Sequence, residues 1–395
     1  METKAVVLGT NYYIGLSIIR TLGYENIKTI AVDYTTEGLY AAKSKYLHSH
    51  VIAPNFREEP KEYLQKLIEI AQEEKTKPLL FPSADPYAEF IDEHLDELKQ
   101  YYLIPMVEKG LWTEIMKKES LFHLANKHGV LVPETIESDD PDLRTRVRDE
   151  LGYPCIVKPV DSPAFMAKFR HKVLYCNNEE ELIEAVRRTQ EAELEVIIQR
   201  IIPGFDDHMY TFDFYIDQSG RVTHWTTCRK LRQFPINFGA SVYTEHKIVP
   251  ELAEIGIPFL EKIGYRGFGE IEFKKDEKTG KFYLIEINIR TTTLNCLLYK
   301  AGINFPYVCY KDMTGDPLPD KAVTTDTGYV FQYLFEDILA CRDYIKSGQL
   351  SFWQVFKSLF RKKAPAVWSF DDPAPAFNYM GILMGKVTNR FFRRV

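Results

Sequence analysis

The sequence predicts an α/β protein in which a doubly wound parallel sheet is followed by a part of α+β character built mainly from antiparallel strands. Three observations predict this class. The chain opens with a strand, a glycine turn, a helix and a second strand; three alternating segments rich in β-formers follow its midpoint; and a strand hairpin comes after them. The composition, with 45% hydrophobic and 27% charged residues, is typical of a globular protein and excludes a disordered or collagenous chain.

The first unit runs from the N-terminus to Trp112 and has the element order of a doubly wound sheet. The elements expected in it are a strand at 4–8, a turn at 9–15, a helix at 16–22, a strand at 29–33, a helix at 61–74, a strand at 78–82 and a helix at 88–100. Asp33 ends the second strand, as an acid does in dinucleotide-binding folds, but the pattern G-x-G-x-x-G is absent. An NAD-dependent oxidoreductase is therefore a weak alternative.

The second unit begins at Thr113 and becomes largely β structure. Helices are expected at 117–128, 179–191 and 251–263, and strands at 153–158, 196–199, 210–216, 222–228, 241–249, 267–274 and 281–289. Turn-forming residues at 276–280 join the last two strands into a hairpin.

This hairpin carries the strongest functional signal. Because side chains alternate between the faces of a strand, Glu270 and Glu272 share one face of the first strand, and Glu286, Asn288 and Arg290 share one face of the second. The second strand is otherwise apolar, and polar groups in such a strand are costly to bury without a role. Carboxylate and amide oxygens are suitable ligands for Mg²⁺, and an arginine beside them suits phosphate. The alternative is an exposed hairpin face with an incidental ion pair.

Three further segments contain bases. Lys158 ends an apolar strand, where it is placed to reach a phosphate; a lysine at a sheet edge is the alternative. The segment from Asp161 to Lys172 combines small residues with bases, and we expect a mobile loop over phosphates. Arg229 and Lys230 belong to a basic cluster expected to follow a strand, which suits a polyanion or is simply a solvated charge run.

The segment from Val196 to His208 is a strand followed by an extended stretch, a Pro-Gly turn and two acids. Extended backbone can hydrogen-bond the edge of an adenine ring, and acids at 206 and 207 can accept from ribose hydroxyls. An ordinary strand and turn explains these residues equally well.

Taken in order, these pieces resemble the ATP-grasp superfamily over roughly residues 1–318. The motifs that carry the resemblance are Phe81–Asp85, Lys118 with the helix exit Gly129–Pro133, Lys158, the stretch Val196–Asp207, and the set Glu272, Glu286, Asn288 and Arg290. Within the superfamily the sequence is most similar to carboxylate–amine ligases related to D-aspartate ligase, on the motifs Gly15–Arg20, Pro203–Asp207, Arg229–Pro235 and Asp371–Pro373.

The resemblance implies an architecture, a reaction and site residues. It divides the chain into a Rossmann-like domain at 1–112, a small lid subdomain at 113–200, a larger antiparallel catalytic subdomain at 201–318 and an aromatic and basic C-terminal extension at 319–395. It implies ATP and Mg²⁺ as cofactors, phosphoryl transfer to a carboxylate, and attack of an amine on the acyl phosphate. The residues implied for ATP are Lys118, Lys158, Gln199, Arg200, Ile202, Asp206 and Asp207, those for the metal are Glu272, Glu286 and Asn288, and those for catalysis are Arg290, Arg229 and Lys230.

Two positions depart from the family pattern. Gln199-Arg200 stands where Gln-Glu is common, so Arg200 replaces a glutamate. Ile289 replaces the proline of an Asn-Pro-Arg step. An ATP-binding scaffold without turnover remains a further alternative. The sequence does not identify the two substrates. D-aspartate with a cell-wall precursor is the family-based expectation, and a secondary metabolite, a capsular polymer or a small dipeptide is equally open as the product.

Charge and cysteine content indicate partners and compartment. The net charge of −6 argues against nucleic acid and favours a small-molecule amino acid or amine and a carboxylate as partners. Six scattered cysteines and no export signal favour a cytoplasmic protein with reduced thiols. From Ser351 onward, eight basic residues stand against two acidic ones among aromatic residues. A weak membrane-surface contact of this tail, its packing on the acidic body, and a homodimer are left open.

Overall fold

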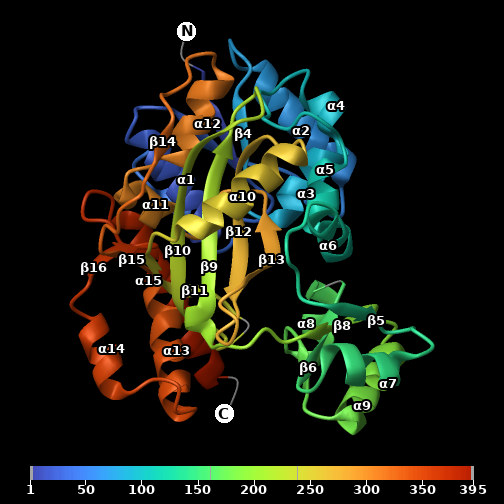
Figure 1. Ribbon diagram of the computed structural model, residues 1–395. Helices are drawn as coiled ribbons and strands as arrows, with labels where there is room; N and C mark the ends of the chain where they lie inside the picture. Colours follow the sequence, from blue (N-terminus) through green and yellow to red (C-terminus); the bar gives the residue numbers. More distant parts are fainter. Residues whose placement is uncertain (1–2, 161, 238, 393–395) are drawn as a thin grey trace.

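The computed structural model describes residues 3–160, 162–237 and 239–392, which form three sheets with helices packed around them (Figure 1). Sheet A is parallel and N-terminal, sheet B is a small antiparallel sheet, and sheet C is a large, mainly antiparallel sheet. This confirms the predicted mixed α/β class with a parallel part followed by antiparallel parts.

Sheet A has the order β3-β2-β1-β4. Its strands are β1 (Ala5–Leu8), β2 (Thr29–Asp33), β3 (Leu47–Ile52) and β4 (Leu79–Pro82), and its helices are α1 (Tyr13–Gly23), α2 (Pro60–Gln72), α3 (Asp85–Glu93) and α4 (Leu95–Leu98). Strand β3 was not predicted, because it is an edge strand whose residues 48–50 are polar and exposed. The single helix expected at 88–100 is instead divided into α3 and α4 at His94.

The glycine turn after β1 is a packing device. Gly9 has a positive φ of 92°, and a Cβ on Gly15 would lie 2.1 Å from the Gly9 carbonyl oxygen. Asp33 is 1% exposed and accepts a hydrogen bond of 2.6 Å from the Thr10 amide and one from its hydroxyl, while His50 lies 2.9 Å away. The Asp33 carboxylate therefore holds the turn, and its position does not favour the ribose contact of a dinucleotide site.

Sheet B has the order β5-β8-β6-β7 and lies in the predicted lid subdomain, for which the name lid is kept below. It follows helices α5 (Leu111–Met116) and α6 (Lys118–Lys127). Its elements are β5 (Thr135–Glu137), α7 (Leu143–Arg146), η2 (Val147–Leu151), β6 (Cys155–Pro159), α8 (Ser162–Phe169), β7 (Leu174–Cys176), α9 (Glu179–Glu191) and β8 (Val196–Arg200). The prediction of a mobile loop at 161–172 is wrong for most of this segment, because α8 occupies it. Asp161 lies outside the described residues. One apolar cluster made only of residues between 136 and 198 forms the core of the lid.

Sheet C has the order β13-β12-β9-β10-β11-β15-β16, with β14 beside β10. Its strands are β9 (Met209–Ile216), β10 (Val222–Phe234), β11 (Ala240–His246), β12 (Gly267–Lys275), β13 (Phe282–Asn288), β14 (Lys321–Ala322), β15 (Tyr329–Gln332) and β16 (Lys362–Pro365). The turn η3 (Asp206–His208) precedes β9, and helices α10 (Pro250–Lys262), α11 (Asn295–Ala301) and α12 (Phe305–Met313) complete this part. Strand β10 runs six residues past its predicted end, so Arg229 and Lys230 lie within a strand and not after it.

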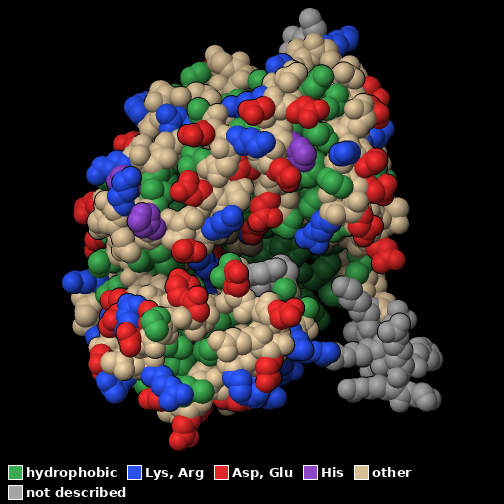
Figure 2. All heavy atoms as spheres, turned by 90° about the vertical axis from the view of Figure 1, so that its right-hand side faces the viewer, with side chains coloured by type: hydrophobic (Ala, Val, Ile, Leu, Met, Phe, Trp, Pro, Cys, Tyr) green, Lys and Arg blue, Asp and Glu red, His purple; other side chains and the backbone are tan. Residues whose placement is uncertain are grey.

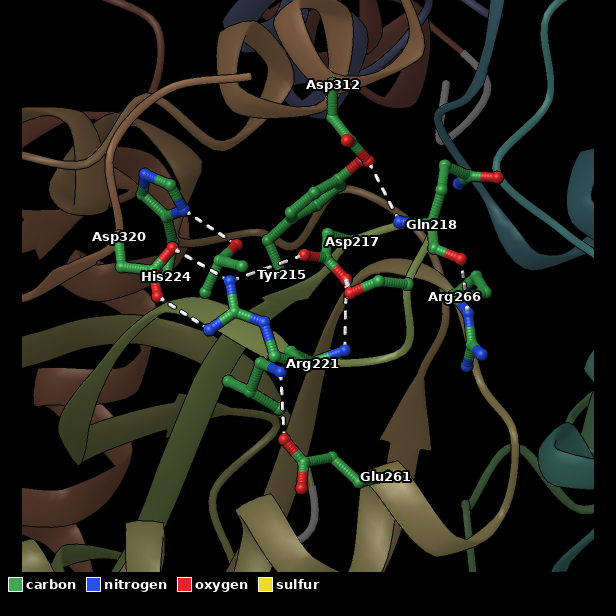
Figure 3. A network of polar contacts seen from close by, with 12 residues as sticks. Tyr215, Asp217, Gln218, Arg221, His224, Glu261, Arg266, Asp312 and Asp320 are labelled. Carbon is green, nitrogen blue, oxygen red and sulfur yellow. Dashed lines mark hydrogen bonds and ion pairs between the residues drawn. The ribbon is translucent and has the colours of Figure 1, made fainter. Parts of the chain in front are cut away.

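The tight turn between β9 and β10 is fixed by a polar network (Figure 3). Asp312 of α12 accepts from the Tyr215 hydroxyl at 2.6 Å and from the Gln218 amide at 3.2 Å. Glu261 of α10 accepts from the Val222 amide at 3.1 Å. These contacts join one end of sheet C to the two helices that pack on it, so the network has a structural role.

The predicted C-terminal extension contributes to the body. Strands β15 and β16 extend sheet C, and helices α13 (Leu334–Lys346), α14 (Phe352–Ser358) and α15 (Ala374–Phe392) follow or flank them. Of the alternatives left open for the tail, packing on the body holds for α15, where Ala376, Tyr379 and Ile382 join an apolar core, but not for the exposed aromatic side chains of α14. Arg393 and Arg394 lie outside the described residues.

A buried ion pair joins this extension to the first domain. Arg20 of α1 donates from Nε to Asp372 at 2.9 Å, and both side chains are at most 7% exposed. Asp372 also accepts from the Ser44 hydroxyl at 2.7 Å and the Lys45 amide at 3.0 Å. Removing one partner of such a pair leaves the other charge buried and uncompensated.

We predict that Asp372→Ala lowers the free energy of unfolding by about 3–5 kcal/mol, because it leaves the Arg20 guanidinium buried without its carboxylate. Urea unfolding followed by fluorescence measures this change. Asp320→Ala, which removes an exposed partner of Arg221, is the matched control and should cost at most about 1 kcal/mol. Equal losses for both variants would contradict the importance of the buried pair.

Candidate functional site

The candidate site lies on the edge of sheet C that faces the lid (Figure 1). Strands β12 and β13 are antiparallel, and their register places Glu272 directly opposite Glu286 and Glu270 opposite Asn288. Figure 2 shows this side of the molecule, which is hollowed between the lid below and the rest of the chain above. The register therefore brings the three predicted metal ligands to one place on the hairpin.

Glu272 is paired with a buried lysine. The Lys230 Nζ lies 2.5 Å from a Glu272 carboxylate oxygen, and the two side chains are 4% and 13% exposed. Burial raises the pKa of Glu272, and Lys230 acts in the opposite direction. Burial lowers the pKa of Lys230, but Glu272 and Glu270 outweigh this and raise it overall, so the lysine stays charged. Lys230 thus neutralises charge within the site.

Glu286 lies in the field of several lysines. Burial raises its pKa, but the positive charges of Lys118, Lys230 and Lys158 outweigh burial and lower it overall. Lys118 is the first residue of α6, and Lys158 stands near the end of β6 in the lid. Burial also lowers the pKa of Lys118. Two predicted nucleotide lysines from separate elements therefore converge on one predicted metal ligand.

Lys158 and Gln199 are neighbours across β6 and β8, since the Lys158 Nζ lies 3.4 Å from Gln199 Oε1. The Gln199 Nε2 is buried and has no hydrogen-bond partner among the described residues. An orphaned donor of this kind fits a ligand acceptor in the cleft. Arg200 instead pairs with Glu134 at 3.1 Å, and Ile202 is buried after the strand.

The two acids after this strand have different surroundings. Asp206 is buried and accepts from the Gln233 side chain at 3.0 Å, the Asn237 amide at 2.8 Å and the Tyr344 hydroxyl. Because both its oxygens are occupied, its position does not favour a ribose contact. Asp207 is partly exposed and pairs with Arg229 at 3.0 Å. Arg229 thus lies beside the predicted ribose residue, on the opposite strand face from Lys230.

Arg290 and Asn288 are held from two sides. The Arg290 Nε lies 2.7 Å from Asp85, and its Nη2 donates to Asn288 Oδ1 at 3.2 Å. The Asn288 amide nitrogen donates to Glu270 at 3.0 Å. Burial, and next the neighbouring Asp213, raise the pKa of Glu270 well above its usual range. Asp213 was not singled out in the sequence, and Asp85 and Glu270 were noted in motifs without being assigned a role.

The residues present fit a divalent cation. Two carboxylates directly opposite each other on paired strands repel unless positive charge lies between them. Glu272, Glu286 and the Asn288 amide provide the hard oxygen donors that Mg²⁺ prefers. Within the described ranges, no three His, Cys, Asp or Glu side chains are grouped for metal binding, and the candidate set instead combines two carboxylates with an amide. The geometry is suited to a metal that also binds a ligand polyanion.

Comparison with known proteins identifies the class. Residues 117–318, just over half of the chain, match the family described as carbamoyl-phosphate synthase L chain, ATP binding domain. The chain is 28% identical over 291 residues to D-aspartate ligase of Enterococcus faecium (strain Aus0004), covering 70% of this chain and 68% of that protein.

Solved structures agree on the fold. A biotin carboxylase–β-γ-ATP complex from Campylobacter jejuni has a TM-score of 0.64 at 19% identity, covering 80% of this chain and 72% of that one. N5-carboxyaminoimidazole synthetase from Staphylococcus aureus has a TM-score of 0.62 at 15% identity, covering 82% and 80%.

The fold and the matched segment define an ATP-grasp enzyme, that is, an ATP-dependent ligase. The chain belongs to the family of the carbamoyl-phosphate synthase L chain ATP-binding domain. This confirms the resemblance stated from the sequence and leaves the NAD-dependent oxidoreductase without support. Among the described helices, none has the length and apolar character needed to cross a bilayer.

The site predicts a pH dependence. Burial lowers the pKa of Lys158 to about 7; Lys118 and Lys172 act in the same direction, and Glu286 and Glu272 oppose it. Since the charged form exists below this pKa, kcat/KM for ATP should fall above about pH 7, approaching tenfold per pH unit. Steady-state kinetics across pH measure this fall.

Arginine does not deprotonate in this range, so Lys158→Arg should remove the alkaline fall, whereas Lys118→Arg should retain it. An unchanged alkaline fall in Lys158→Arg would contradict the assignment of this titration to Lys158.

Proposed function

We propose that this protein is an ATP- and Mg²⁺-dependent carboxylate–amine ligase that forms an amide or peptide bond through an acyl phosphate. The observation that carries the proposal is the opposed pair Glu272 and Glu286 with Lys230 in contact with Glu272. The positive charges of Lys118 and Lys158, which lower the pKa of Glu286, support it. A buried group of this charge fits a metal-bound triphosphate better than any single anion. The curated relative of 28% identity supports the ligase chemistry.

The proposed reaction has two steps. A carboxylate oxygen of the first substrate attacks the γ-phosphorus, the bond to the bridging oxygen breaks, and ADP leaves. The amine of the second substrate then attacks the acyl carbon, the carbon–oxygen bond to phosphate breaks, and a proton leaves the nitrogen. Bound Mg²⁺ would offset charge on the phosphate oxygens and would be held by Glu272, Glu286 and Asn288.

The remaining residues bind and orient in this proposal. Lys158 of the lid binds a phosphate group, and Gln199 binds the adenine. Asp207 accepts a hydrogen bond from a ribose hydroxyl. Arg290, fixed by Asp85, is placed to offset charge on the transferred group. Lys230 offsets the charge of Glu272 and opposes the effect of burial on its pKa. A hydrolysis-prone acyl phosphate requires exclusion of water, for which the lid, where α8 and β6 share an apolar core, is suited.

The finer proposal concerns substrate and place. D-aspartate with a cell-wall precursor is the first pair to test, because the relative of 28% identity is a D-aspartate ligase. All six cysteines are free, which agrees with a cytoplasmic reaction.

We predict that Glu286→Gln lowers ATP-dependent ADP release by at least about 10²-fold, because a neutral amide removes one anionic donor from the site. A coupled ADP assay measures the loss, and circular dichroism verifies the fold. Glu277→Gln, in the exposed turn of the same hairpin, is the control and should retain activity. Retained turnover in Glu286→Gln would remove the proposed metal assignment.

A phosphate-release screen of amino acids with wall precursors, followed by mass spectrometry, tests the substrates. We expect release only when an acid and an amine are both present, with a product whose mass equals their sum less water. ATP binding without phosphate release in any mixture would favour a non-catalytic nucleotide-binding scaffold.

A further inference from the structure

An apolar surface lies on and directly after α14. Five large side chains there are 41% to 76% exposed, and they are Phe352, Trp353, Phe356, Leu359 and Phe360. Helix α14 lies at the outer edge of the molecule, on the opposite side from the lid (Figure 1). Contiguous exposed apolar groups of this size mark an interaction surface. We call these five residues the aromatic face.

The aromatic face is oriented away from the protein. Residues 352, 353, 356 and 360 recur at the spacing that places side chains on one side of a helix, and such a stripe normally packs on the core. Here the rings contact one another, with centroids 6.5 Å apart for Phe352 and Phe356 and 5.3 Å apart for Phe356 and Phe360. No α14 residue is buried, so the stripe does not contribute to the core.

Polar contacts fix the helix in this orientation. The Tyr243 hydroxyl donates to the Ser358 carbonyl at 2.7 Å, and Lys363 Nζ donates to the same carbonyl at 2.9 Å. At the other end, Ser351 and Gln354 form a capping box. The helix is therefore held to the body at its C-terminal end and capped at its N-terminal end, and its aromatic face is exposed to solvent.

The segment that carries the aromatic face is positively charged. The segment 351–370 contains Lys357, Arg361, Lys362 and Lys363 and no acidic residue, although the whole chain has a net charge of −6. Arg361 pairs with Glu245 at 2.7 Å, whereas Lys357 and Lys362 are exposed. Aromatic side chains with flanking lysines are the pattern of a helix that lies in the interface of an anionic bilayer.

We propose that the aromatic face binds an anionic lipid surface, with Trp353 and the phenylalanines in the headgroup region and Lys357 and Lys362 beside lipid phosphates. Helix α14 has seven residues and is far too short to span a bilayer. A second copy of the chain fits less well, since a symmetric contact through this face would bring the same lysines together. The proposal is independent of the ligase chemistry.

Cosedimentation with phosphatidylglycerol-containing vesicles tests the proposal on the full chain. We expect the wild type to bind these vesicles and to bind phosphatidylcholine vesicles much more weakly. The triple variant Phe352→Ser, Trp353→Ser, Phe356→Ser should lose at least about tenfold in binding, because it removes the groups that enter the interface. Lys357→Gln with Lys362→Gln should reduce only the preference for the anionic vesicles.

The matched control is Ile52→Ser with Val107→Ser, two exposed apolar residues of the first domain, and it should bind like the wild type. ADP release measured without vesicles should be unchanged in every variant, which separates failure here from failure of the ligase proposal. Wild-type binding that the triple variant retains would overturn the proposal. Absence of wild-type binding to any vesicle would also overturn the proposal. In that case, self-association in sedimentation equilibrium that the triple variant abolishes would show that the face binds a second copy of the chain.

Discussion

The site depends on a local electrostatic conflict. Glu272 and Glu286 lie directly opposite each other on paired strands, in a largely buried position where two carboxylates repel. Lys230 offsets the charge of Glu272 by direct contact, and Lys118 and Lys158 stabilise the ionised form of Glu286. These lysines therefore favour the ionised form of the pair against the effect of burial. A bound metal would offset the charge of the two glutamates, and the polyphosphate that it binds would pair with the lysines.

The lysines come from two parts of the chain with separate apolar cores, because α6 shares its core with sheet C whereas the lid has its own. Lys230 is on β10 of sheet C, Lys118 begins α6, and Lys158 is on β6 of the lid, whose apolar core contains lid residues only. A ligand held by all three would join the lid to sheet C. Asp85, which pairs with Arg290, adds a contact from the first domain. Three structural units thus meet at one group of charges.

Local patterns in the sequence predicted much of this arrangement. Alternation along β12 and β13 placed Glu272, Glu286 and Asn288 on shared faces, and the short turn at 276–280 fixed their pairing. The long-range contacts could not be read in this way. Lys230 was expected after a strand, either as a base for a polyanion or in a solvated charge run. Its burial could not be predicted, because the acids that pair with Lys230 and Arg232 lie on β12 and α13. Asp206 was expected to contact the ribose, but its carboxylate accepts a hydrogen bond from the hydroxyl of Tyr344, which lies 138 residues later in the chain.

A structure determined with a non-hydrolysable ATP analogue and Mg²⁺ tests the central claim most directly. The account predicts a metal within bonding distance of Glu272, Glu286 and Asn288, with the triphosphate between them and the lysines of the lid and α6. A triphosphate bound elsewhere, with these oxygens facing bulk water, would contradict it and leave a member of the ATP-grasp superfamily whose active site is not the one described.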